Sequence, residues 1–166
     1  LIKEIVTNSK DKVLNKVDIQ LDKDQKYASG TNYDSSGKLS STYKDIVANE
    51  YNQLTSIKEY KADSTLKSSS ENTYDKQYWK RGTTKDSSGH VTYKGENKYD
   101  DKWNVIENTN TTSKIDSTHK YVDTTVTKKW RYDRFDNMGN WTQRTEMNDK
   151  GKPTKIYKRE LTYFKK

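Results

Sequence analysis

The sequence predicts an all-β protein, a sequential antiparallel meander of about eleven strands in one open, twisted or solenoid-like sheet. Three observations predict this fold. Apolar and polar residues alternate over short segments, thirteen Tyr residues favour strands, and a turn pattern, Asp/Asn-x-x-Gly, recurs four times. The four copies begin at Asp34, Asp86, Asp136 and Asn148. Closure of the same strands into an up-and-down barrel with a Tyr-lined interior is the alternative.

The turn pattern has a clear physical role in a meander. Its first residue, Asp or Asn, can accept a hydrogen bond from the backbone two residues on, and its Gly allows a positive φ three residues later. A type I turn followed by a left-handed Gly makes a hairpin loop with a bulge. The two C-terminal copies are separated by residues 140–147, just long enough for one strand, so residues 130–164 are expected to form a three-stranded meander.

Residues 1–12 are expected to form an N-terminal extension, and residues 13–166 a single β-repeat domain. The apolar residues of the extension have the spacing of either a short helical turn or an edge strand. From residue 13 onward apolar and polar residues alternate, as they do in strands. Weaker turn signals divide the remaining chain into strands near Asn49, Asp63, Asp75, Asp100 and Asp116.

Composition argues for an ordered sheet with an unusual interior. Only 25 of the 166 residues are Leu, Ile, Val or Phe, and the net charge is +8, a combination common in disordered chains. The Tyr residues and four Trp residues supply surface that a fold can bury, so we expect order. The absence of Cys excludes disulfides and thiolate metal sites, and no apolar stretch is long enough for a membrane-spanning helix.

Tyr is followed by Asp or Asn at five places, where Tyr is expected to close a strand and the next residue to open its turn. These pairs begin at Tyr33, Tyr51, Tyr74, Tyr99 and Tyr132. The segment YDSSGKL, residues 33–39, resembles the tyrosine-aspartate (YD, or RHS) repeat proteins and matches their Tyr-Asp-x-x-Gly-x-Leu unit at every fixed position. The segment FDNMGNWTQRTEMNDKGKP, residues 135–153, is similar to repeat-containing envelope proteins of the Bacteroidetes type.

This resemblance implies an all-β, non-enzymatic, exported protein, and it supplies no catalytic residues. We therefore expect an extracytoplasmic location, in the periplasm or at the cell surface, as a lipoprotein. Contact with a membrane is expected only through a lipid anchor that is not present in this chain. No cofactor is expected.

The residues themselves do not indicate a metal or catalytic site. The two histidines, His90 and His119, are isolated and follow turns, without the three or four ligands that a zinc site needs. No nucleophile motif or Gly-rich phosphate loop is present. A pair of glycosidase carboxylates contributed by separate strands is the one enzymatic alternative.

The four tryptophans are the candidate ligand-binding residues. They are Trp79, Trp103, Trp130 and Trp141. Aromatic faces on a rigid sheet can stack on sugar rings, whereas the alternative is that the rings fill a core with few aliphatic residues. Trp103 and Trp141 lie beside turns, so we expect these two to be the exposed pair.

The excess positive charge lies at the C-terminal end, where residues 120–166 contain 13 Lys and Arg against 6 Asp and Glu. The residues expected to contact an anionic partner are Arg131, Arg134, Arg144, Lys155, Lys158 and Arg159. Lysines on a terminal strand also prevent edge-to-edge pairing, which is the alternative role. No specific binding to nucleic acid is expected, because acidic residues are interleaved with the basic ones.

The function expected from these features is that of a non-enzymatic binding or scaffold module of a bacterial cell envelope. Its partner would be a glycan or another envelope protein, contacted through aromatic residues. A structural segment of a larger YD-repeat shell is the second hypothesis, and a glycan-active enzyme is the third.

Overall fold

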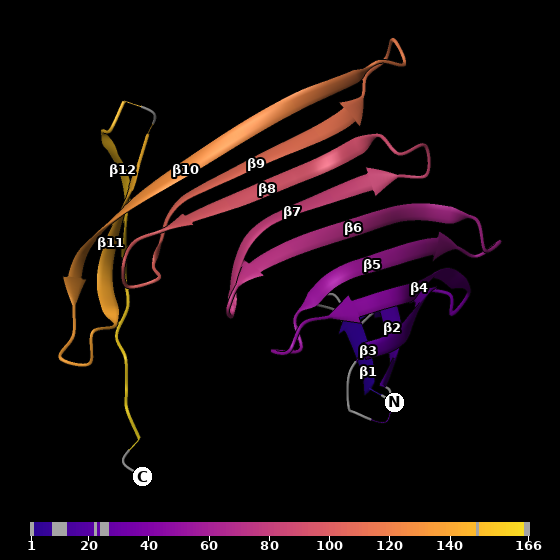
Figure 1. Cartoon of the computed structure of the whole chain (residues 1–166), viewed down its shortest axis with the longest axis horizontal. Helices are drawn as coiled ribbons and strands as arrows, with labels where there is room; N and C mark the ends of the chain where they lie inside the picture. The colour runs from indigo at the N-terminus through magenta and orange to yellow at the C-terminus, as the bar shows by residue number, and fades with distance from the viewer. Residues whose placement is uncertain (1, 8–12, 22, 24–26, 149, 165–166) are drawn as a thin grey trace.

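The computed structural model describes residues 2–7, 13–21, 23, 27–148 and 150–164, and these residues form one antiparallel sheet of twelve strands (Figure 1). The strands are β1 (Ile2–Thr7), β2 (Val13–Leu21), β3 (Tyr27–Asp34), β4 (Leu39–Ala48), β5 (Leu54–Lys61), β6 (Leu66–Asp75), β7 (Tyr78–Asp86), β8 (Val91–Tyr99), β9 (Val105–Ile115), β10 (Tyr121–Phe135), β11 (Trp141–Met147) and β12 (Pro153–Lys158).

The sheet is open, and its strand order is the order of the sequence. The backbone of each described strand lies beside only the strands that precede and follow it, so β1 and β12 are the two edges of the described sheet. Figure 1 shows a strongly twisted sheet in which β11 and β12 run at a steep angle to the long strands β6 to β9. The predicted open meander is confirmed, and the described strands do not close into the alternative barrel.

One more strand is present than the approximate count of eleven predicted from the sequence. Residues 2–7, within the segment expected to be an N-terminal extension, form the edge strand β1, in which Ile2 pairs with Ile19 of β2. Of the two alternatives for this segment, the structure therefore contains the edge strand. The residues between β1 and β2, 8–12, lie outside the described part of the chain.

Eight of the connecting loops share one backbone geometry. In each, the N–H of the fourth residue donates to the C=O of the first, and the N–H of the first donates to the C=O of the fifth. The loops begin at Asp34, Asn49, Lys61, Asp86, Asp100, Asp116, Asp136 and Asn148. The fourth residue has a positive φ in all eight, as expected for a type I turn followed by a bulge.

The side chain of the first loop residue reinforces this geometry. In seven of the eight loops an Asp or Asn Oδ1 accepts hydrogen bonds from the backbone N–H groups two and four residues on. The exception is the loop that begins at Lys61, where Asp63 instead accepts from Thr65. The predicted turn chemistry is confirmed, and it extends to loops that lack Gly.

Tyrosine hydroxyls close three successive hairpins in the same way. Tyr74 donates to the carbonyl of Leu54 at 3.1 Å, linking the end of β6 to the start of β5. Tyr99 donates to the carbonyl of Trp79 at 2.5 Å, and Tyr132 to that of Val105 at 2.9 Å. We call this contact the tyrosine clasp. Because each tyrosine clasp joins the two strands of one hairpin, the hairpin rather than the single strand is the repeating unit of this part of the sheet.

Two of the five Tyr-Asp/Asn pairs do not have the expected role. Tyr51 and Asn52 lie inside a loop that begins at Asn49, and Asn52 holds the positive-φ position. Asp133, after Tyr132, lies within β10, where the pairing with β11 shifts register. The prediction that Tyr closes a strand and Asp opens a turn is wrong at these two places, because the loop and the bulge each displace the pair from a strand end.

The sheet is a single layer, and no hydrophobic residue in its described part is buried. Half-buried aromatic and amide side chains replace a core. The indole of Trp79 donates to Asn72 Oδ1 at 2.9 Å and covers the backbone of Gly82 and Gly95. A Cβ atom at Gly95 would lie only 2.7 Å from this ring, so the close approach requires Gly.

Candidate functional site

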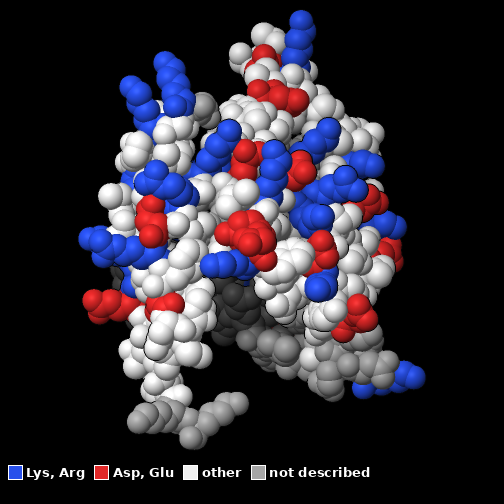
Figure 2. All heavy atoms as spheres, turned by 60° about the vertical axis from the view of Figure 1, so that its left-hand side comes forward, with Lys and Arg blue, Asp and Glu red and all other residues white. Residues whose placement is uncertain are grey.

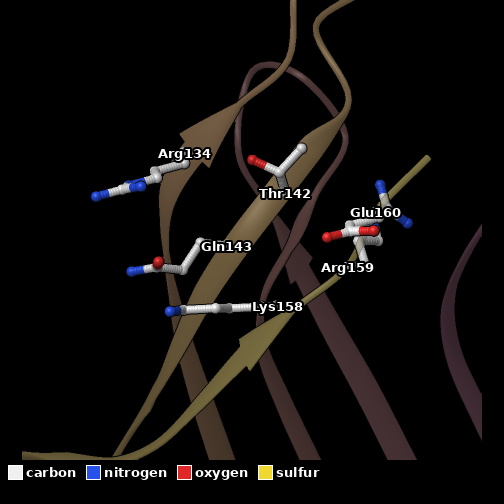
Figure 3. Close-up of a pocket in the computed structure, with 6 residues that line it drawn as sticks. All are labelled: Arg134, Thr142, Gln143, Lys158, Arg159 and Glu160. Carbon is white, nitrogen blue, oxygen red and sulfur yellow. The ribbon is translucent and has the colours of Figure 1, made fainter.

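The last three strands bring several of the predicted basic residues together on one face. Arg134 of β10, Gln143 of β11 and Lys158 of β12 are direct cross-strand partners, so their side chains point to the same side of the sheet. Figure 3 shows these three side chains extending in parallel from the strands. With Thr142, Arg159 and Glu160 they line an open groove of about 570 Å³, which we call the basic groove.

A bulge in β10 places Asp133 beside this row. The register between β10 and β11 shifts at Asp133, whose carboxylate accepts from Thr145 Oγ1 at 2.5 Å and from Arg131 Nε at 2.7 Å. These two bonds hold the pKa of Asp133 below its usual value. Arg131 is thus part of an ion pair beside the groove. No ion pair within the described part of the chain engages Arg134 or Lys158.

On the opposite face, Arg144 lies among three aromatic rings. Its guanidinium carbon is 5.3 Å from the ring centre of Trp130, 4.8 Å from that of Trp141 and 5.0 Å from that of Tyr157. The guanidinium carbon of Arg159 lies 3.8 Å from the ring centre of Trp141. Its Nε donates to the carbonyl of Trp141 at 2.6 Å. These five residues form the arginine–aromatic cluster, which is held by cation–π contacts.

Two tryptophans predicted to be exposed are half-buried. Trp141 packs against the guanidinium groups of the arginine–aromatic cluster. Trp103 stacks on Tyr78, with ring centres 4.4 Å apart and planes 9° from parallel, and lies 5.9 Å from Tyr99. The expected exposure is therefore wrong, because neighbouring side chains cover part of each ring. Ligand binding by these residues stays a prediction.

Trp103 also holds an unusual backbone conformation. Its φ of 62° places it at the fourth loop position, where four other loops have Gly. A large side chain is disfavoured there by about 1 to 2 kcal/mol. The stack on Tyr78 offsets part of that cost, since aromatic pairs contribute about 0.5 to 1.5 kcal/mol beyond their buried area.

The remaining predicted site residues lie apart from the groove. Lys155 of β12 lies over the ring of Tyr157, with Nζ 4.9 Å from the ring centre. Trp79 is on β7, in the middle of the sheet, where it contacts Asn72. The structure thus joins the C-terminal arginines, Trp130 and Trp141 in one region, and it separates Trp79 and Trp103 from them.

Sequence reasoning missed a contact between two loops at the opposite end of the hairpins. Tyr121 donates to Asp86 Oδ2 at 2.6 Å, and its ring stacks on His90 at 3.4 Å. His90 also shares a 3.1 Å hydrogen bond with Ser113. Bonds from Ser88 and Tyr121 lower the pKa of Asp86 to about 2. Asp86 and Tyr121 are 35 positions apart in the sequence, so no local pattern indicated this contact.

Basic residues are spread over the side of the molecule seen in Figure 2, with acidic residues among them. Some of this charge is paired, as in Glu107, which lies 2.7 Å from Lys98 and 3.5 Å from Lys129. Among the described residues, no group of three or more His, Cys, Asp or Glu is placed to hold a metal ion. The described part of the chain also contains no helix long and apolar enough to cross a membrane.

Comparison with known proteins leaves the chain without a family. No protein family and no curated protein matches it. The solved structures that are similar to it include the crystal structures of TcdB2-TccC3-Cdc42 and TcdB2-TccC3-TEV. The first is 12% identical, with a TM-score of 0.45 over 93% of this chain and 9% of that chain. The second is 12% identical, with a TM-score of 0.43 over 94% of this chain and 10% of that chain. This chain therefore spans about a tenth of either, and the likeness is too distant to assign it.

Proposed function

We propose that this chain is a non-enzymatic scaffold module of a bacterial envelope, a stretch of repetitive sheet suited to a larger YD-repeat shell. The observation that carries this proposal is that each described strand pairs only with its sequence neighbours. Successive hairpins repeat the same loop and the same tyrosine clasp. Assemblies of this kind grow by adding units and present an extended surface.

Many polar side chains of the loops and strand ends form hydrogen bonds within the sheet, which supports a scaffold role. The loop carboxylates are occupied by backbone N–H groups and by Ser or Thr hydroxyls, and these bonds lower the pKa of residues such as Asp34 and Asp116. The clasp hydroxyls are occupied by carbonyls. The basic groove has a single carboxylate in its lining, Glu160, whereas glycoside hydrolysis needs a pair.

The extracytoplasmic location is part of the proposal and can be tested in the source cells. An antibody raised against this chain should detect an envelope-associated species much larger than 19.5 kDa. Labelling with radioactive palmitate should mark the same species if a lipid anchor holds it. A soluble cytoplasmic species of 19.5 kDa would contradict the scaffold proposal.

A second candidate function, glycan binding, is favoured by the stacked pair of Trp103 and Tyr78. Parallel rings on a loop offer a flat surface that suits a sugar ring, and both residues are partly accessible. On a glycan array, Trp103→Ala should abolish binding, and Trp141→Ala should reduce it less because guanidinium groups already cover that ring. Binding that neither change affects would remove this candidate.

A further inference from the structure

The outer edge of β12 has backbone groups available for another strand. The N–H of Arg159 donates to the carbonyl of Thr142 at 3.0 Å, so the backbone of Arg159 faces β11. Inward and outward backbone groups alternate along an antiparallel strand. The N–H and C=O groups of Thr154, Ile156 and Lys158 therefore face away from β11, where the described sheet has no further strand.

The side chains of this edge combine positive charge with exposed apolar surface. Lys155 and Lys158 have no ion-pair partner among the described residues, and Glu146, opposite Lys155, instead accepts from the Tyr157 hydroxyl at 2.6 Å. Ile156, between the two lysines, is 58% exposed. An exposed apolar residue beside free backbone groups is typical of an interaction site.

Charge determines which kind of strand can pair here. A second copy of β12 would add two more lysines to an edge that already has two without an ion-pair partner among the described residues, and Lys on an edge strand opposes edge-to-edge pairing. An acidic strand would meet the lysines with opposite charge. Lys155 and Lys158 are three residues apart and so lie on opposite faces, which requires acidic residues at the same spacing in the partner. An apolar partner residue opposite Ile156 would cover its exposed side chain.

Single-stranded nucleic acid fits this edge less well than an acidic peptide. Its bases need aromatic faces on which to stack. Three large rings of the last three strands, Trp130, Trp141 and Tyr157, are engaged by Arg144 on the opposite face from the basic groove. A peptide strand, in contrast, uses the backbone groups that β12 leaves available.

We propose that β12 is a docking edge for an extended, acidic segment of a partner protein, which adds to the sheet as one more antiparallel strand. Backbone hydrogen bonds to Thr154, Ile156 and Lys158 hold the segment. Lys155 and Lys158 select its charge. The inference goes beyond the scaffold role.

A synthetic peptide tests this proposal with the whole 166-residue chain. The probe is a capped nine-residue peptide of Thr and Val, with Glu at the two positions that would face Lys158 and Lys155. It should bind and shift backbone NMR signals of β12, whereas replacing both Glu by Lys should weaken binding at least about tenfold. N-methylation of the backbone amides that face β12 should abolish binding, because it removes the hydrogen bonds and keeps the charge.

Variants of the chain test whether binding depends on the β12 edge itself or only on the positive charge of the protein. Lys155→Gln with Lys158→Gln should weaken binding about tenfold, as expected for two exposed ion pairs. Lys150→Gln with Lys152→Gln, a matched loss of two charges in the neighbouring loop, should change it less than about twofold. Ile156→Pro should abolish binding, because proline removes an outward N–H and leaves the inward bonds in place.

Three results would overturn the proposal. The first is that the acidic peptide does not bind. The second is equal binding by the N-methylated peptide, which would show attraction by charge alone. The third is tighter binding of a single-stranded oligonucleotide than of the peptide, with the affinity falling steeply as salt increases. Circular dichroism of each variant checks that the sheet is retained.

Discussion

The hairpins in the middle of the sheet and the hairpin at its C-terminal end are closed by different chemistry at the same place. In β7–β8 the neutral hydroxyl of Tyr99 donates to the carbonyl of Trp79. In β11–β12 the guanidinium of Arg159 donates to the carbonyl of Trp141. In both, the accepting residue lies at the start of the first strand of the hairpin.

This difference between the middle and the last hairpin shows where a one-layer sheet can accommodate charged side chains. A middle hairpin has neighbours on both sides, and its side chains are occupied by bonds such as that of Trp79 with Asn72. The last hairpin has a neighbour on one side, so its guanidinium groups and lysines can face solvent or a partner. Charged side chains without an ion-pair partner among the described residues, such as Lys155 and Lys158, are therefore compatible with the last hairpin.

The largest expected effect is the loss of an aromatic ring from the middle of the sheet. Trp79→Ala should lower the free energy of unfolding by about 3 kcal/mol, because it exposes the backbone at Gly82 and Gly95 and leaves Asn72 without its donor. Trp141→Ala should cost about half as much, since that ring lies at the last hairpin. Urea denaturation measures both. Equal losses of unfolding free energy in the two variants would mean that the middle and the end of the sheet are packed alike.

The next effect tests whether the two clasps are equivalent. Tyr99→Phe should cost about 1 kcal/mol, because the carbonyl of Trp79 loses its donor. Arg159→Lys keeps the charge but loses the Nε bond and the planar stack on Trp141, and it should cost a similar amount. Thermal unfolding of both variants provides the comparison. No change in Arg159→Lys would show that the guanidinium is not a clasp.

A smaller effect separates two loops with strained fourth residues, His119 with φ 61° and Trp103 with φ 62°. His119→Gly should raise the free energy of unfolding by about 0.5 kcal/mol, because Gly adopts this conformation without steric cost. Trp103→Gly should lower it, since the stack on Tyr78 is lost. Chemical denaturation gives the sign of each change. The same sign in both would remove the structural role assigned to Trp103.

The smallest effect concerns two loops with the same sequence, DSSG. The pKa of Asp86 is lowered from 3.8 to about 2, by Ser88 first and then by Tyr121, whereas Asp34 has the Ser and backbone bonds but no Tyr. A lowered folded-state pKa contributes stability that is present above about pH 4 and is lost as the pH falls toward 2. Tyr121→Phe should raise the pKa of Asp86 toward that of Asp34, measured by NMR titration of the carboxyl carbons. An unchanged Asp86 pKa with a changed Asp34 pKa would contradict this explanation.

Local rules predicted the loops well, because each loop is specified by residues within it. The Asp-x-x-Gly signal located the loops at Asp34 and Asp86, and the Asp signal alone located the one at Asp100. The same rules gave no reason to expect Trp103 at a position that favours Gly, since its stabilising contact comes from Tyr78 at the start of β7.

The basic groove could not be predicted from alternation. Tyr132 and Arg134 are two residues apart and would share a face in a regular strand. The bulge at Asp133 places Tyr132 opposite Arg144 and Arg134 opposite Gln143, so the two side chains lie on opposite faces. The position of a bulge depends on pairing between strands, which the sequence of one strand does not specify.

The central claim, that each hairpin depends only on its neighbours, is tested most directly by hydrogen–deuterium exchange of the whole chain with and without Tyr99→Phe. The account predicts faster exchange in β7 and β8 and in the adjoining strands β6 and β9, with the amides of β11 unchanged. A uniform increase in exchange across all twelve strands would contradict it, because the sheet would then open as one cooperative unit.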